Sequence, residues 1–299
     1  MKELKKIFAK LEKENKAIGH FNVSNLESFE AVISAAKKTK TPIIIGVSEG
    51  AIKHAGLDFF LWAKKYFQKK YGSTFFLHLD HGSDLKLIEN CINGGFDSVM
   101  IDASKKTFEE NVYLTKYIVR LAHRKGVWVE AELGTIGGKE ENINNRKIVF
   151  TDPLQAEEFV KKTGCDSLAI SIGTSHGQNK FLKKAELNFD VLVKVKHLVD
   201  IPLVLHGASS VDKKITSALK KEGVKIGNPI GLDDNNLSKA VKLGIRKVNS
   251  DTDLNLVGIL EFLKVSKEKD QDLKIYKILE KSGQSITDEV IRKIKVLSK

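Results

Sequence analysis

Cysteine, arginine and long apolar runs are all scarce in this chain, and each absence argues against a class of protein. The 299 residues contain two cysteines, Cys91 and Cys165, far apart and without a CxxC pattern. We therefore expect no disulfide framework. We expect a reducing, cytoplasmic location in which both thiols are buried. No run of 18 apolar residues occurs, so no membrane span is expected. The N-terminal segment shows helical spacing rather than the apolar core of a signal peptide.

The chain is basic, with a formal net charge of +12, yet only five of its residues are arginine. Lysine is dispersed along the sequence, without a block of five or six like charges. The charge therefore indicates a lysine-rich composition or an anionic substrate. A non-enzymatic basic binding protein is an alternative, but it would need Lys and Arg clustered with aromatic residues. We expect no specific nucleic-acid partner and no membrane partner.

Short segments rich in Val, Ile, Leu or Phe alternate with helical patterns, as expected for strands covered on both faces. The predicted strands are residues 17–23, 42–47, 74–80, 98–103, 127–133, 167–173, 202–208 and 245–251. Helical periodicity covers 26–38, 59–71, 108–125, 153–163 and 189–198. This alternation predicts one α/β domain over 1–299, a (β/α)8 TIM barrel with extra N-terminal and C-terminal helices. A doubly wound sheet is the alternative.

Three histidines, His81, His176 and His206, each stand where a predicted strand gives way to a loop. A barrel brings the ends of strands three, six and seven to one mouth, so three imidazoles can close three sides of a tetrahedral metal site. The open fourth position is typical of catalytic zinc. A barrel metallohydrolase also uses several histidines, but it often carries HxH on the first strand, and GHFNV (19–23) has no second histidine.

Carboxylates lie beside these histidines. Asp80 precedes His81 and is expected either to move a proton on bound substrate or to orient a histidine. Glu130 and Glu132 share one face of the fifth strand. Glu140 and Glu141 lie in a Gly-containing loop, where an ordinary solvated charge pair is the simpler interpretation and a mobile base the alternative.

Two polar turns follow the last two strands. GASS (207–210) opens a predicted helix, and NSDT (249–252) ends the eighth strand. Backbone N–H groups and hydroxyls at such turns suit a phosphate, and the seventh and eighth loops are the habitual phosphate site of barrels. The sequence thus predicts a phosphate end to the site.

The chain resembles class II, metal-dependent fructose-bisphosphate and tagatose-bisphosphate aldolases. The resemblance runs from about residue 19 to 254 and rests on GVSEGA (46–51), LHLDHGS (77–83), SVMIDAS (98–104), VEAELGTIGG (129–138), IGTSHG (172–177), PLVLHGASS (202–210) and KVNSDTDL (247–254). It implies a lyase of glycolysis and gluconeogenesis. This enzyme would reversibly cleave fructose 1,6-bisphosphate to dihydroxyacetone phosphate and glyceraldehyde 3-phosphate through a zinc-stabilised enediolate. It also implies a catalytic Zn²⁺, a monovalent cation (Na⁺ or K⁺), and a homodimer or homotetramer.

The resemblance assigns a role to each matching position. Asp80 would handle the proton on the C4 oxygen, and Glu140 would exchange a proton with dihydroxyacetone phosphate. His81, His176 and His206 would bind zinc, with Glu132 at the metal region or a second metal position. The substrate, its phosphate and the monovalent cation would be held by residues from several loops: Gly177, Gly207, Ser209, Asn249, Asp251, Thr252, Asn22, Ser48 and Lys180.

Two positions depart from the family pattern. Asn255 stands where many fructose-specific members have an arginine that reads the distal phosphate, and Ser210 stands where glycine is common. The first departure leaves tagatose bisphosphate as the alternative substrate. Asp251 and the extra stretch before the eighth strand favour fructose bisphosphate.

Overall fold

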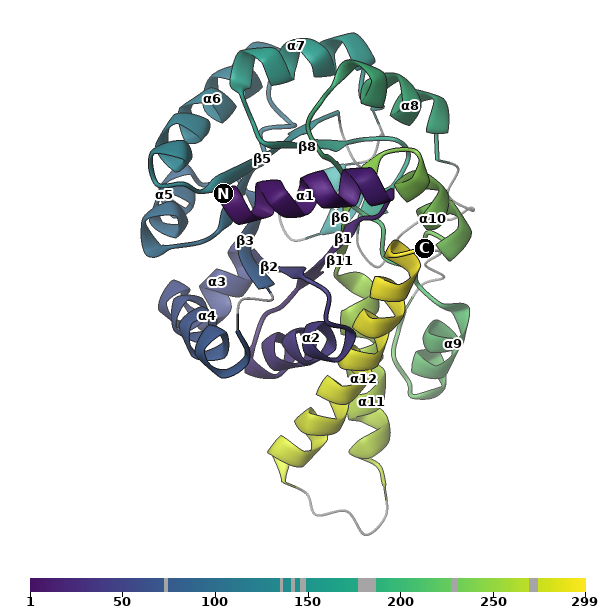
Figure 1. Cartoon of the computed structure of the whole chain (residues 1–299). Helices are drawn as coiled ribbons and strands as arrows, with labels where there is room; N and C mark the ends of the chain where they lie inside the picture. The colour runs from purple at the N-terminus through teal and green to yellow at the C-terminus, as the bar shows by residue number, and fades with distance from the viewer. Residues whose placement is uncertain are drawn as a thin grey trace.

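The eight predicted strands form a closed parallel barrel (Figure 1). A computed structural model describes residues 1–72, 75–134, 137–140, 143–145, 149–176, 187–226, 231–268 and 274–299, with the backbone alone at 137–140, 143–145 and 175–176. The strands follow one another around the barrel in chain order, and β11 closes it against β1. They are β1 (Ile18–Asn22), β2 (Ile43–Ser48), β3 (Phe75–Gly82), β4 (Ser98–Ile101), β5 (Trp128–Leu133), β8 (Ser167–Ile170), β10 (Leu203–Leu205) and β11 (Ile245–Ser250). The TIM-barrel prediction is therefore confirmed.

Helices surround the barrel, and every helix that the periodicity predicts is present. Asp152 begins α7 as expected: its carboxylate accepts the backbone N–H of Gln155, with Pro153 in the first turn. The helices are α1 (Lys2–Glu14), α2 (Leu26–Thr39), α3 (Glu49–Ala55), α4 (Leu57–Tyr71), α5 (Leu85–Gly94), α6 (Phe108–Arg124), α7 (Pro153–Thr163), α8 (Phe189–Leu198), α9 (Lys213–Lys221), α10 (Asp234–Lys242), α11 (Thr252–Val265) and α12 (Ile275–Leu297). None of the described helices is long and apolar enough to cross a bilayer.

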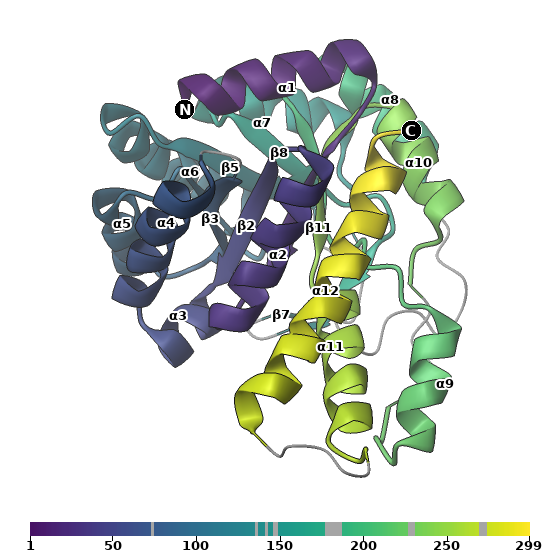
Figure 2. The ribbon, with the colours of Figure 1, turned by 60° about the horizontal axis from the view of Figure 1, so that its bottom comes forward.

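Helix α1 closes one end of the barrel, across which it lies in Figure 2. Its Leu4 and Phe8 are buried against residues from the N-terminal parts of the strands, including Ile44 and Trp128. The Phe8 and Trp128 rings stack with centroids 5.1 Å apart. This apolar plug leaves the opposite end, where the strands finish, to carry polar groups.

The barrel interior becomes polar above that plug. Side chains alternate in and out along each strand, so His78 and Glu130 share the lumen with Lys247. The Lys247 ammonium lies 2.8 and 2.9 Å from the two carboxylate oxygens of Glu130, and both residues are almost fully buried. A buried charge needs a partner of this kind, and the pair lies directly beneath the mouth of the barrel.

Two further features frame the mouth. The C-terminal helices α11 and α12 run side by side and project beyond the barrel (Figure 1). A small sheet is formed by β6 (Gly137–Glu140), β7 (Ile143–Asn145) and β9 (Ser175–His176). The sequence predicts a Gly-hinged loop at 137–142, whereas the described backbone there pairs in strands.

Candidate active site

The carboxyl ends of the strands surround a cavity of about 550 Å³. Its lining includes Asn22, Ser48, Asp80, His81 and Asp251, five of the residues predicted for the site. Asn22 is the last residue of β1, Asp80 lies two residues before the end of β3, and Asp251 directly follows β11, as expected for the catalytic face of a barrel. Ser48 ends β2, and its hydroxyl accepts the backbone N–H of Ala51 at 3.1 Å to begin α3.

His81 and His206 face one another at the mouth. His81 Nε2 and His206 Nδ1 lie 2.9 Å apart, with the two rings nearly perpendicular. His81 has a φ of 48°, in the left-handed region that non-glycine residues seldom adopt. Adjacent residues on a strand normally point to opposite sides, but this turn lets His81 and Asp80 both reach the site. The structure therefore brings together two of the three predicted metal-binding histidines.

The second ring nitrogen of each histidine is held by a carboxylate. His81 Nδ1 is 2.9 Å from Asp102 Oδ2, and His206 Nε2 is 2.9 Å from Glu130 Oε1. Burial by itself would lower the pKa of His81, but the charges of Asp80 and Asp102 outweigh it and raise that pKa to about 10. Carboxylates placed behind histidines in this way fix the ring orientation of metal ligands.

Glu132 provides an independent sign that a cation belongs here. It is 3% exposed, and its Oε2 has no hydrogen-bond partner among the described residues. Burial, with the nearby charge of Asp102, raises the pKa of Glu132 well above its usual range. The same Oε2 is 3.8 Å from His206 Nδ1, the atom that faces His81. A divalent cation among these groups would supply the positive charge needed to compensate the buried Glu132 carboxylate. The described residues therefore fit a divalent cation.

Asp80 is fixed by two amides. Asn22 Nδ2 donates to Asp80 Oδ2 at 2.9 Å, and Asn249 Nδ2 donates to Asp80 Oδ1 at 3.1 Å. One ligand atom from each of Asp80, His81 and His206 lies within 4.8 Å of the others. The carboxylate therefore stands beside the histidine pair in a defined orientation, as its position before His81 predicts.

Four predicted residues lie partly or wholly outside the described residues. Gly177 and Lys180 lie entirely outside them, and the side chains of Glu140 and His176 lie outside them as well. The backbone does bring the two segments together, because β6 and β9 pair in parallel with Gly138 opposite His176. The loops after β5 and β8 are thus joined beside the mouth.

The two predicted phosphate turns are in contact. Gly207 has a φ of 61°, a conformation that glycine tolerates best. Ser209 Oγ accepts the backbone N–H of Asp251 at 3.2 Å, which links the loop after β10 to the loop after β11. Asp251 is the N-cap residue of α11 and Thr252 is the first residue of that helix, so backbone N–H groups gather there.

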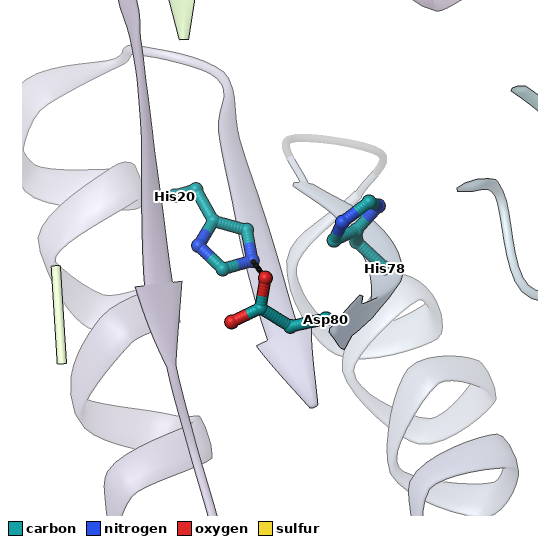
Figure 3. A group of neighbouring side chains, drawn as sticks. All are labelled: His20, His78 and Asp80. Carbon is teal, nitrogen blue, oxygen red and sulfur yellow. Dashed lines mark ion pairs between the residues drawn. The ribbon is translucent and has the colours of Figure 1, made fainter. Parts of the chain in front are cut away.

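A second cluster of metal-ligating side chains lies deeper in the barrel. His20, His78 and Asp80 are all buried, and His20 Nε2 points toward Asp80 Oδ1 at 3.9 Å (Figure 3). His78 Nδ1 is 2.8 Å from Ser98 Oγ, and its Nε2 is 3.4 Å from the Lys247 ammonium. A metal cation at this cluster would be repelled by the buried Lys247 ammonium. We therefore interpret His20 and His78 as neutral side chains that pack behind Asp80.

Sequence reasoning missed one residue and undervalued another. Asp102 directly follows the buried β4 segment, and a carboxylate at a strand end was the available signal. Glu130 was recognised as a strand acid, but its contacts with both Lys247 and His206 depend on strands far apart in sequence.

Comparison with known proteins agrees with this geometry. The family model described as fructose-bisphosphate aldolase class-II matches residues 2–299. The fructose-bisphosphate aldolase of Helicobacter pylori strain 26695 is 40% identical over 294 residues, covering 97% of this chain and 96% of the relative. That of Giardia intestinalis is 36% identical over 298 residues, covering 98% and 91%.

Solved structures show the same likeness. The YdjI aldolase of Escherichia coli K12 superposes with a TM-score of 0.79 at 32% identity, covering 98% of this chain and 96% of that one. A structure titled as a putative fructose-1,6-biphosphate aldolase from Coccidioides immitis gives 0.81 at 27% identity, covering 98% and 94%. The chain belongs to the class II fructose-bisphosphate aldolase family.

Proposed function

We propose that this chain cleaves fructose 1,6-bisphosphate reversibly into dihydroxyacetone phosphate and glyceraldehyde 3-phosphate. The observation that carries the proposal is the pair of facing histidine nitrogens, 2.9 Å apart, with the buried Asp80 carboxylate beside them. Cleavage of a β-hydroxy ketone requires a base for the hydroxyl proton and an electron sink for the carbanion, and a metal site next to a fixed acid/base group can supply both. The whole-length family match supports the same reaction.

The class implies a divalent metal, and we propose zinc. His81 and His206, with His176, would hold it, because three imidazoles and one open position are typical of catalytic zinc. Glu132 would serve the metal region or a second metal position. When bound, the cation supplies Lewis acidity that stabilises negative charge on the substrate's ketone oxygen.

Asp80 is the proposed base. In the cleavage direction its carboxylate accepts the proton of the C4 hydroxyl, the bond between C3 and C4 breaks, and C4 becomes the aldehyde carbon of the leaving product. Its two amide partners, Asn22 and Asn249, hold the acceptor oxygens in place. Glu140, protonated at the start of cleavage, would then donate that proton to C3 of the remaining fragment, which completes dihydroxyacetone phosphate. The pairing of β6 with β9 supports this role, since it joins the Glu140 segment to the His176 segment.

The dihydroxyacetone phosphate end of the substrate is proposed to lie against the loops after β10 and β11. Gly207 and Ser209 would surround the phosphate together with Gly177 and a monovalent cation, Na⁺ or K⁺. Asn249, Asp251 and Thr252 would hold the neighbouring carbons and hydroxyls. The contact between Ser209 and Asp251 supports this, because it presents both loops as one surface.

The distal end decides between two sugars. Asn22, Ser48 and Lys180 are proposed on this side of the substrate. Asn255 is exposed and donates to Asp251 Oδ1 at 2.9 Å, and it brings no positive charge to a second phosphate. This observation keeps tagatose 1,6-bisphosphate, the C4 epimer, as a second candidate substrate. We propose fructose bisphosphate as the main one, in a cytoplasmic homodimer or homotetramer of glycolysis and gluconeogenesis.

A direct comparison of both sugars tests the proposal. The purified protein is assayed with fructose bisphosphate and tagatose bisphosphate, and formation of dihydroxyacetone phosphate is followed through its reduction. We expect a higher kcat/KM for fructose bisphosphate. A preference for the tagatose sugar would move the chain to the alternative substrate, and no cleavage of either would reject the reaction.

A further inference from the structure

The last helix of the chain carries a lysine buried deep in the structure. Lys293 on α12 has no exposed surface, and its ammonium lies 3.0 Å from Asp253 Oδ2, a carboxylate that is itself 3% exposed. Removing two charges from water is costly, and a buried ion pair often stabilises a fold no better than apolar residues would. A buried pair of this kind therefore calls for an explanation beyond stability.

The contacts of Lys293 point to such an explanation. Besides Asp253, the ammonium donates to Ser210 Oγ at 2.6 Å and lies 3.4 Å from the Ala208 carbonyl oxygen. The backbone N–H of Ser210 also donates to Asp253 Oδ2, at 3.1 Å. The Lys293 ammonium thus holds the loop after β10 and the start of α11 in fixed positions relative to one another.

These are the two loops proposed to receive the substrate phosphate. Ser209, whose Oγ accepts the Asp251 N–H at 3.2 Å, is the residue next to Ser210. The loops are therefore tied twice, by Ser209 on the side of the site and by Lys293 from behind. Ser210 matters here, because glycine at that position would offer no hydroxyl to the ammonium.

We propose that Lys293 is a positioning residue for phosphate recognition, which holds the Ala208–Ser210 loop and the first residues of α11 (Asp251–Asp253) at the spacing that a phosphate needs. This inference rests on the proposed function, since it takes the phosphate site from it. Lys293 does not contact the substrate; it acts through Ser210 and Asp253. Preorganised donors bind an anion without first having to be ordered, so loosening the loops weakens binding more than it slows chemistry.

The test is Lys293→Met, with Lys295→Met as the matched control. Both lysines lie on α12, and Lys295 is exposed whereas Lys293 is buried. We expect KM for fructose bisphosphate to rise about tenfold in Lys293→Met with kcat within about threefold of wild type, the loss of about one charged hydrogen bond. The inhibition constant of inorganic phosphate should rise in parallel. Lys295→Met should match the wild type in both.

A second variant allows for misfolding. Lys293→Met takes away the ammonium that lies 3.0 Å from the buried Asp253 carboxylate, which can destabilise the fold. The double variant Lys293→Met/Asp253→Asn removes both charges, while Ser210 still loses its ammonium donor. If either variant folds and its KM and phosphate inhibition stay at wild-type values, the inference is overturned, even if its thermal midpoint falls. If wild-type protein cleaves neither sugar, the proposed function fails instead. Direct titration of inorganic phosphate into wild type and variant then still decides whether Lys293 supports anion binding.

Discussion

Replacing Asp80 by alanine separates proton transfer from metal binding. Asp80 is 4% exposed and is oriented by Asn22 and Asn249, but it borders the cavity, so water can satisfy the two amides when the carboxylate is gone. We therefore expect the free energy of unfolding to change by less than about 1 kcal/mol. A positioned general base contributes about 10²- to 10⁴-fold, so kcat should fall by that factor, or about 2.7–5.5 kcal/mol of barrier.

Two assays make this prediction specific. Overall cleavage is measured by coupled reduction of dihydroxyacetone phosphate, and exchange of its C3 hydrogen with solvent is measured by NMR in D₂O. In the proposed mechanism the exchange needs Glu140 and the metal but not Asp80, so we expect it to stay within about threefold of wild type. Asp58→Ala, an exposed carboxylate on α4, is the control and should change neither rate.

Either of two results would contradict this role of Asp80. Loss of bound metal in Asp80→Ala would show that the carboxylate is a ligand rather than a base. Equal loss of cleavage and of C3 exchange would show that Asp80 does not act specifically on the C4 oxygen.

Three further predictions concern the barrel interior. A Cβ at Gly46 would lie 2.1 Å from His20 Nε2, so Gly46→Ala should destabilise by about 1–3 kcal/mol, and adding His20→Ala should recover much of the loss in denaturant titrations. Lys247→Met removes the ammonium partner of the buried Glu130 carboxylate and should cost about 3–5 kcal/mol of unfolding free energy. A loss below about 1 kcal/mol would contradict the importance of this buried pair. Burial lowers the pKa of His20 and His78 well below 6.5 in the folded chain. The unfolded chain therefore takes up more protons as pH falls below about 6.5, and stability should drop by on the order of 1 kcal/mol per histidine by pH 5.5. His20→Asn should remove the contribution of one histidine to this drop.

The sequence was sufficient to predict the barrel because its strands are covered on both faces. A segment such as 42–47 is almost uniformly apolar, and a short run of this kind between two helical patterns is typical of a strand buried on both faces. The strand-end rule then placed Asp80, His81 and His206 at one mouth, and the structure brings them together.

Side-chain partners across the barrel were harder to predict, because they depend on long-range register. Nothing local pairs Glu130 with Lys247, 117 positions away, or Lys293 with Asp253. The positive φ of His81 is a second example, since it lets the adjacent residues Asp80 and His81 both reach the site. Such features follow from closure of the barrel rather than from any one segment.

Metal dependence most directly tests the proposal that the His81 and His206 site holds a metal needed for cleavage. The protein is stripped with a chelator, its metal content and its cleavage of fructose bisphosphate are measured, and zinc is then added back stoichiometrically, with His206→Ala treated in parallel. We predict that cleavage disappears with the metal and returns with zinc in the wild type, while His206→Ala regains little of either. Cleavage that continues at the full rate in metal-free protein would contradict the claim.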